Sequence, residues 1–215
     1  MRNQNPSKVI FNKITEMKPE FRYDGNMPFE QWQKTARKKL YELLGLGYME
    51  KCDFEFKIEH EKDRGSYTEI RFSFQSEPGY FVPCYIMLPK NPVKPVPVMI
   101  CVQGHSTGMH ISLGVARYPG DEKIITEGDR NFAQIALKEG FCPVVIEQRY
   151  MGECGGDEIS PGCCAHGRSS TAYATPSLLL GRCAIGERVW DISRLIDVII
   201  KEFPDIDINN ISCMG

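Results

Sequence analysis

The sequence predicts an α/β fold whose second half is built on a parallel sheet. Three strand-like segments carry this prediction: "VPVMICVQ" at 96–103, "FCPVVIEQR" at 141–149 and "INNISCMG" at 208–215. The first two are continuous apolar runs, as expected of strands buried on both faces. Helical patterns at 129–140 and 186–204 separate the three segments. The alternation of strand and helix is typical of parallel strands joined by right-handed crossovers.

The first 90 residues follow two other patterns. Residues 1–50 are expected to be helical, because residues 28–46 place apolar side chains near one helical stripe that would pack on a core. The members of the stripe are Phe29, Trp32, Ala36, Leu40, Leu43 and Leu44. Residues 51–90 contain three segments rich in aromatic and β-branched residues with turn residues between them, which predicts an antiparallel meander. The proline-rich stretch 88–97 is expected to connect this meander to the parallel part.

The two helical patterns of the second half differ in length. The shorter one, at 129–140, ends at a glycine and follows a long loop. The longer one, at 186–204, predicts an amphipathic helix with an inward apolar face. The side chains expected to face inward there are Val189, Ile192, Leu195, Ile196 and Ile199.

Composition limits the class of protein. The net charge is -2, without the basic cluster that nucleic-acid binding requires, so we expect no nucleic-acid partner. No apolar run approaches the roughly 20 residues of a membrane helix, and the N-terminal residues lack a signal-peptide core, so we expect a cytoplasmic protein with no membrane partner. In that compartment the nine cysteines are expected to be reduced. Four of them lie in apolar runs and are expected to be buried: Cys84, Cys101, Cys142 and Cys213.

Two loops follow the predicted parallel strands and could bind a ligand. In "VQGHSTGMH", Gly104 and Gly108 permit sharp turns whose backbone amides could face a developing oxyanion. The alternative is an ordinary βα loop with exposed His105 and His110. In "EQRYMGECGG", Arg149 stands where the strand ends and would either tie the loop to a helix or contact substrate.

Two further stretches bear on a metal site and on a nucleophile. The stretch "GCCAHG" holds Cys163, Cys164 and His166, and Cys154 precedes it, but their spacing is not that of a zinc site, so no metal or cofactor is expected. The last segment ends in Gly215. A glycine that closes a strand after a long helix is what the nucleophile elbow G-x-S-x-G requires at its first position, although any strand can end in glycine.

Taken together, four stretches resemble the α/β-hydrolase superfamily, in the branch of acetyl xylan esterase-like and dienelactone hydrolase-like proteins. They are "VMICVQGHSTGM", "NFAQIALKEGFCPVVIEQRYMGE", "GRCAIGERVWDISRLIDVI" and "INNISCMG", and the resemblance covers roughly residues 80–215. It implies one α/β-hydrolase domain over 1–215, apparently incomplete. Its parts would be a helical N-terminal extension at 1–50, antiparallel strands at 51–90 and a parallel βαβ part at 91–215.

The resemblance also implies roles for single residues. Gly104, His105 and Ser106 would form the oxyanion loop, with the amide of His105 as one donor; Gln103 stands where the family often has His. Arg149 and Gly152 match the family's Asp-x-Arg-Gly turn, whose role is mainly structural, with Glu147 in place of Asp. Glu187, Arg188 and Asp191 match the helix that leads to the elbow, and His110 would lie in the pocket or support it.

By the family's order of Ser, then Asp or Glu, then His, the whole triad would lie beyond residue 215. The serine would be two positions past Gly215, and His105, His110 and His166 would all precede it. We therefore expect the chain to be the N-terminal part of a serine ester hydrolase acting on a small ester. Its partners would be a second copy or the missing C-terminal half. Two alternatives remain: a cysteine nucleophile in the elbow, or a non-catalytic binding or structural module if the chain truly ends at Gly215.

Overall fold

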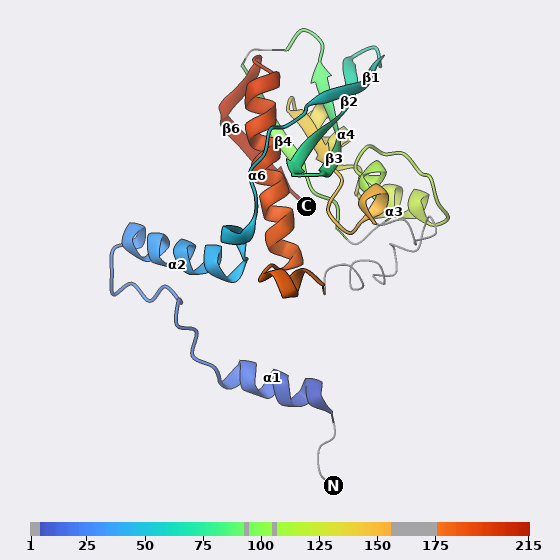
Figure 1. Cartoon of the computed structure of the whole chain (residues 1–215). Helices are drawn as coiled ribbons and strands as arrows, with labels where there is room; N and C mark the ends of the chain where they lie inside the picture. The colour runs from blue at the N-terminus through green and yellow to red at the C-terminus, as the bar shows by residue number, and fades with distance from the viewer. Residues whose placement is uncertain (1–4, 93–94, 105–106, 156–175) are drawn as a thin grey trace. The chain divides into compact units, whose positions relative to one another are not determined.

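The computed structural model describes residues 5–92, 95–104, 107–155 and 176–215 (Figure 1). The chain divides into two compact units, Met1–Leu43 and Leu44–Gly215, and each is described by itself. The prediction of one domain over 1–215 therefore stays a prediction.

The first unit contains two helices, α1 (Pro6–Glu16) and α2 (Phe29–Leu43). Asn5 caps α1 by accepting a hydrogen bond from the amide of Ser7, and a proline begins the helix. Before and within α2, Tyr23, Phe29 and Trp32 pack their rings together at centroid distances of 5.1–5.5 Å. No residue of α2 is buried, so the packing of its apolar stripe on a core stays a prediction.

The second unit is built on a six-stranded mixed sheet in the order β1-β2-β3-β5-β4-β6. The antiparallel meander is confirmed: β1 (Lys57–Asp63), β2 (Tyr67–Glu77) and β3 (Tyr80–Pro89) pair as two hairpins, and β3 continues antiparallel onto β5. The predicted parallel part is β5 (Cys142–Ile146), β4 (Val96–Cys101) and β6 (Ile206–Met214). Strand β4 lies parallel to both of the others. The strand order agrees with the partial α/β-hydrolase fold that the sequence resemblance implies.

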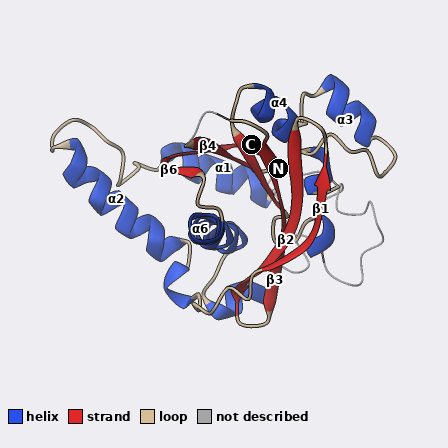
Figure 2. Cartoon of the chain, turned by 90° about the horizontal axis from the view of Figure 1, so that it is seen from above, coloured by secondary structure: helices blue, strands red, loops and turns tan. Residues whose placement is uncertain are grey.

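Helices cover both faces of the sheet (Figure 2). On one face, α6 (Ala184–Glu202) buries Leu195, Val198 and Ile199 in a core with Phe72, Ile86, Ile100 and Val144 of four strands. On the other face, α4 (Phe132–Lys138) buries Phe132 and Ala133 against Met87 and Cys101. The remaining elements are α3 (Asp121–Glu127) and short 3-10 turns: η1 (Leu46–Tyr48), η2 (Met109–Ile111), η3 (Gly152–Cys154) and η5 (Leu178–Leu180).

Three details correct the sequence-based expectations. Residues 121–127 form α3 within what was expected to be a loop. Val189 is 40% exposed, whereas Glu187, Asp191 and Arg194 of the same helix are buried. Cys213 is exposed, because β6 is the border strand of the described sheet, while Cys84, Cys101 and Cys142 are buried as predicted. Among the described residues, no helix has the length and apolar character to cross a membrane.

Candidate functional site

The carboxyl ends of β4 and β6 meet at one edge of the sheet. Because the two strands are parallel neighbours, the segments that follow them leave the sheet on the same side. The amide of Val102 donates a hydrogen bond to the carbonyl of Met214 over 2.8 Å. A Cβ atom on Gly215 would lie 2.7 Å from the carbonyl oxygen of Val102. The segment after β4 and the end of β6 are therefore in direct contact, and the contact requires a glycine at 215.

The loop after β4, residues 103–109, was predicted to be the oxyanion loop. Gly104 is exposed at its start, whereas His105 and Ser106 lie outside the described residues. Gly108 has a φ of 148°, and a Cβ there would lie 3.0 Å from Oε2 of Glu147 and 3.1 Å from Nδ1 of His110. The end of the loop is therefore packed tightly against the loop that follows β5.

His110 is buried and supports the 103–109 loop. Its Nε2 lies 2.9 Å from Oδ2 of Asp121, the first residue of α3, and 3.0 Å from the hydroxyl of Thr107. The same hydroxyl donates to Oδ1 of Asp121 over 2.6 Å. Burial lowers the pKa of His110, which favours the neutral ring near pH 7. Of the two roles left open for His110, these contacts favour the supporting one, since they tie the loop to α3.

Glu147, the residue after β5, is fully buried and joins three backbone segments. Its Oε1 accepts a hydrogen bond from Nε2 of Gln103 over 2.7 Å, and both carboxyl oxygens accept from the amide of Met109 at 3.1 and 3.2 Å. Oε2 also accepts from the amide of Glu153 over 3.2 Å. Burial raises the pKa of Glu147 to about 8, although the hydrogen bonds from the two amides oppose the shift. From the sequence, Glu147 was noted only as standing in place of the Asp of the family's Asp-x-Arg-Gly turn. These contacts could not be predicted.

Gly152 makes room for the Glu147 carboxyl group. A Cβ atom on Gly152 would lie 2.2 Å from Oε2 of Glu147, and its φ of 46° is one that side chains rarely adopt. A glycine at 152 is therefore needed both for space and for backbone conformation. This explains the glycine of the Arg-Gly pattern in physical terms.

Arg149 bridges the loop after β5 to α6 and β2. Its Nε and Nη2 bind both carboxylate oxygens of Asp191 at 2.9 and 2.7 Å, and its Nη1 lies 2.8 Å from Oε2 of Glu77. Burial lowers the pKa of Arg149, but the hydrogen bonds and charges of Asp191 and Glu77 outweigh it and raise the net pKa, so the guanidinium stays charged. These contacts favour the structural role predicted for Arg149 over a substrate contact.

The other residues matched to the helix before the elbow complete this anchor. Nε of Arg188 donates to the carbonyl of Arg149 over 3.0 Å. Glu187 is buried and accepts a hydrogen bond from the hydroxyl of Tyr150, the next residue of the loop. Glu187, Arg188 and Asp191 therefore all hold the loop after β5 against α6.

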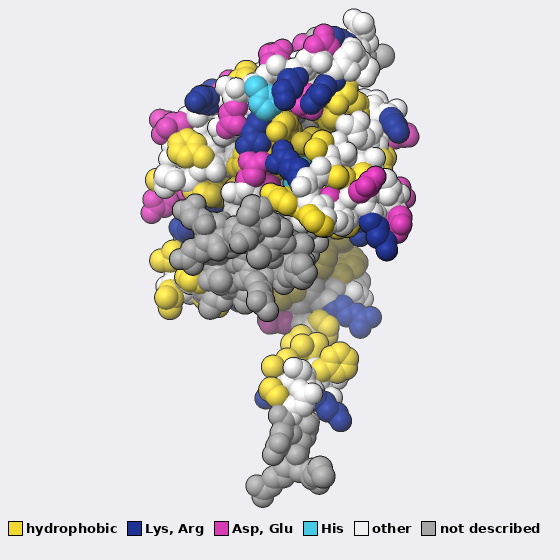
Figure 3. Space-filling view, turned by 90° about the vertical axis from the view of Figure 1, so that its right-hand side faces the viewer, with side chains coloured by type: hydrophobic (Ala, Val, Ile, Leu, Met, Phe, Trp, Pro, Cys, Tyr) yellow, Lys and Arg dark blue, Asp and Glu magenta, His cyan; other side chains and the backbone are white. Residues whose placement is uncertain are grey.

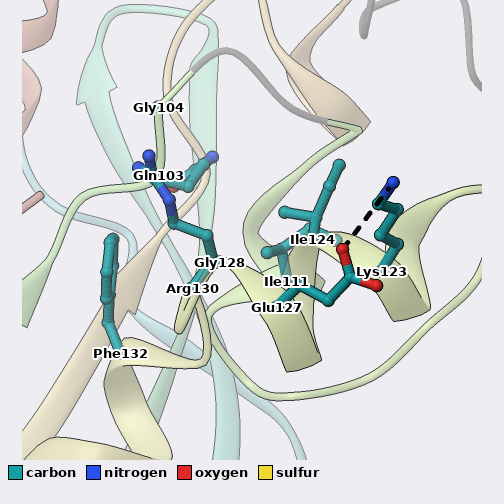
Figure 4. A pocket seen from close by; sticks show the side chains of 9 residues that line it. All are labelled: Gln103, Gly104, Ile111, Lys123, Ile124, Glu127, Gly128, Arg130 and Phe132. Atoms are coloured by element: carbon teal, nitrogen blue, oxygen red, sulfur yellow. Dashed lines mark ion pairs between the residues drawn. The ribbon is translucent and has the colours of Figure 1, made fainter.

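A cavity of about 480 Å³ opens beside Gln103 and Gly104. In Figure 4, the side chain of Arg130 extends toward these two residues, and Phe132 lies on one side of it. Ile111, Ile124 and Phe132 give the cavity apolar walls, and an exposed ion pair, Lys123–Glu127 at 3.7 Å, lies at its far side. The cavity thus adjoins the start of the 103–109 loop.

Acidic and basic side chains form ion pairs on the surface around Glu153, in the loop after β5. Arg71 pairs with Glu59 and Glu153, each at 2.5 Å, and Arg117 pairs with Glu153 at 3.2 Å. The face in Figure 3 correspondingly shows both charge signs interspersed over this unit. Arg117 and Arg71 together hold Glu153, whose amide donates to Glu147.

Comparison with known proteins agrees with this fold. A family model described as Abhydrolase family matches residues 3–186, so the chain belongs to the Abhydrolase family. A search of the curated proteins found no match.

Solved structures with a similar fold include three named as esterases. A Bacteroides fragilis NCTC 9343 protein assigned as an acetyl xylan esterase is 17% identical with a TM-score of 0.77, covering 100% of this chain and 55% of that one. A glucuronoyl esterase from Solibacter usitatus is 16% identical with a TM-score of 0.55, covering 88% and 53%. Acetyl xylan esterase 1 from Thermoanaerobacterium sp. JW/SL YS485 is 17% identical with a TM-score of 0.52, covering 88% and 55%. The chain thus spans about half the length of these structures.

Proposed function

We propose that the protein is a serine-type carboxylic ester hydrolase and that the described chain supplies its oxyanion loop and part of its substrate pocket. One observation carries the proposal. The carboxyl end of β6 lies against Val102, at the start of the 103–109 loop, so a nucleophile placed just after Gly215 would emerge beside that loop. Membership of the Abhydrolase family and the similar fold of proteins named as esterases support the same activity.

The proposed reaction is acyl transfer. The hydroxyl of the serine attacks the ester carbonyl, a histidine takes its proton, and backbone amides of the oxyanion loop and of the residue after the serine bind the negative oxygen. Loss of one such donor typically raises the barrier by about 3–4 kcal/mol. The assignment of one donor to the amide of His105 belongs to this proposal.

A small ester or lactone is the substrate class that we propose. The cavity beside Gly104 has a volume of about 480 Å³ and apolar walls from Ile111, Ile124 and Phe132, which suits a short acyl or alcohol group. The partner expected for the border strand β6 is the C-terminal half of the protein, with a second copy as the alternative. A cytoplasmic location is also part of the proposal, and the free, buried thiols of Cys84 and Cys101 are compatible with a reducing compartment.

The test compares a protein extended to the length of the similar structures with the 215-residue chain. We expect the extended form to hydrolyse p-nitrophenyl acetate and to be inactivated by a fluorophosphonate, while the 215-residue chain does neither. Inactivation by iodoacetamide alone would identify a cysteine nucleophile instead. An extended, folded protein without hydrolysis and without reaction with either reagent would contradict the proposal and favour a non-catalytic binding module.

A further inference from the structure

We propose that Glu147 is a positioning residue that holds the two described ends of the 103–109 loop, at Gln103 and Met109. The proposal rests on the ester hydrolase function proposed above, because only that function gives the 103–109 loop its task. Glu147 does not line the cavity beside Gly104, so its effect on the reaction would pass through the loop.

Glu147 contacts one residue at each end of the 103–109 loop. Gln103 precedes Gly104, and Met109 ends the loop, and a single carboxyl group binds both. The third contact, to the amide of Glu153, fixes the carboxyl group from the loop after β5. Because this group is the shared partner of both ends, its removal would free both ends together.

The surroundings leave little freedom for the carboxyl group. Glycines stand at 108 and 152, where a Cβ would lie 3.0 and 2.2 Å from Oε2 of Glu147. The backbone of Gln103 is held as well, since its carbonyl accepts a hydrogen bond from Nε2 of Gln148. A misplacement of about 1 Å in such a supporting contact can lower the rate about 100-fold.

The two protonation states of Glu147 bind the loop differently. The ionised group only accepts hydrogen bonds, which suits the three N–H donors around it. The neutral group carries an O–H that needs an acceptor. The side-chain oxygen Oε1 of Gln103 is buried without a hydrogen-bond partner among the described residues, and it becomes this acceptor if the Gln103 amide turns over.

Other titratable groups around Glu147 modulate this equilibrium. Glu153 raises the pKa of Glu147 and Arg117 lowers it, both less than burial does. The thiols of Cys84 and Cys154 also lie near it, and burial raises the pKa of each, so they stay neutral. His110 lies beside Gly108, as Glu147 does: a Cβ on Gly108 would be 3.1 Å from Nδ1 of His110. Burial favours the neutral form of His110.

The test uses three variants of the full-length enzyme, with p-nitrophenyl acetate as substrate and active sites counted by fluorophosphonate titration. Glu147→Ala should lower kcat about 100-fold with little change in KM. Glu147→Gln should keep most of kcat, because its amide accepts from Met109 and, once the Gln103 amide has turned over, donates to Oε1 of Gln103. The wild type should show an inflection of kcat near pH 8 that Glu147→Gln lacks. As the matched control, Glu69→Gln alters a buried glutamate of β2 that pairs with Arg64, and it should keep the wild-type profile.

A second readout separates this proposal from the proposed function. Hydrogen exchange of the Met109 and Glu153 amides should be faster in Glu147→Ala than in the wild type, whether or not the protein hydrolyses esters. The proposal is overturned if Glu147→Ala keeps the wild-type kcat per active site, or if Glu147→Gln keeps the inflection. Should the wild type be inactive, the ester hydrolase function fails, and unchanged amide exchange in Glu147→Ala would then overturn the role of Glu147 as well.

Discussion

Two buried acidic side chains flank the loop after β5, and they differ in what compensates their charge. Asp191 receives two hydrogen bonds from the Arg149 guanidinium and one from the hydroxyl of Ser76 at 2.5 Å. Among the described residues, the hydrogen bonds to Glu147 come from uncharged N–H groups. In the part of the chain that the structure describes, no cation forms an ion pair with Glu147.

This difference separates an anchor from an adjustable contact. Burial raises the pKa of Asp191 as well, but the hydrogen bonds and the charge of Arg149 oppose that shift. Breaking the pair would leave an uncompensated charge in the interior. A carboxyl group that is buried among neutral donors changes its charge near neutral pH, because burial raises its pKa to about 8. The same loop is thus fixed at Arg149 and adjustable at Glu147.

The largest expected effect is on the anchor. Arg149→Met leaves Asp191 buried without its cation, while Glu77 keeps Arg182 at 3.1 Å, and should lower the free energy of unfolding by about 3–5 kcal/mol in urea. Arg188→Met removes one hydrogen bond to the carbonyl of Arg149 and serves as the control, with an expected loss of about 1 kcal/mol. If the two variants lose the same unfolding free energy, the ion pairs of Arg149 contribute no more to stability than the single hydrogen bond of Arg188.

The next effect tests how closely the Glu147 carboxyl group is packed. Gly152→Ala places a Cβ 2.2 Å from Oε2 of Glu147 and should lower the free energy of unfolding by about 2–4 kcal/mol. The matched control is Gly79→Ala, where φ is 80° but nothing lies within 4 Å of the added Cβ. Backbone strain alone should reduce stability there by about 1 kcal/mol. A Gly152→Ala loss no larger than this would mean that the loop moves aside freely.

The pH dependence of stability sharpens the comparison further. The pKa of Glu147 is raised to about 8 in the folded chain, so its contribution to stability is full below the unfolded value of 4.5 and is lost as the pH rises through 8. Between pH 6 and 8 the wild type should lose about 2–3 kcal/mol of unfolding free energy that Glu147→Gln retains. The unfolding free energies of both proteins are measured by urea titration at each pH. If they change with pH in the same way, a neutral carboxyl group is not buried at 147.

The smallest effect concerns a surface pair at the cavity. Lys123 and Glu127 are exposed and 3.7 Å apart, so Lys123→Ala should change the unfolding free energy by less than about 0.5 kcal/mol. Thermal unfolding of this variant and of the wild type measures the difference. If Lys123→Ala lost as much unfolding free energy as Arg149→Met, exposed and buried ion pairs would contribute equally to the stability of this protein.

Strand positions in the second unit could be predicted from the sequence, because continuous apolar runs leave few alternatives for β4 and β5. Helix α3 was missed because "DEKIITE" buries only Asp121 and shows no apolar periodicity. The inward face of α6 was predicted from apolar residues alone, which placed Val189 inward. The burial of Glu187 and Asp191 instead depends on Arg149 and Tyr150, partners that the sequence does not place beside them.

The candidate site was predictable to a similar degree. Gly104 and Gly215 were indicated by motif, and the structure places Gly215 beside the start of the loop that contains Gly104. The role of Glu147 was not predictable, since its burial results from two loops closing over it. The pair of glycines at 108 and 152 was the signal that could have indicated a crowded group between those loops.

The most direct test of the account is to map the residue that a fluorophosphonate labels. The full-length protein is labelled, digested, and analysed by tandem mass spectrometry. The account predicts a single labelled serine at the second position after Gly215, because the proposed nucleophile would follow the end of β6, which lies against Val102 at the start of the 103–109 loop. A label on a serine remote from this segment, or on a serine within residues 1–215, would contradict it.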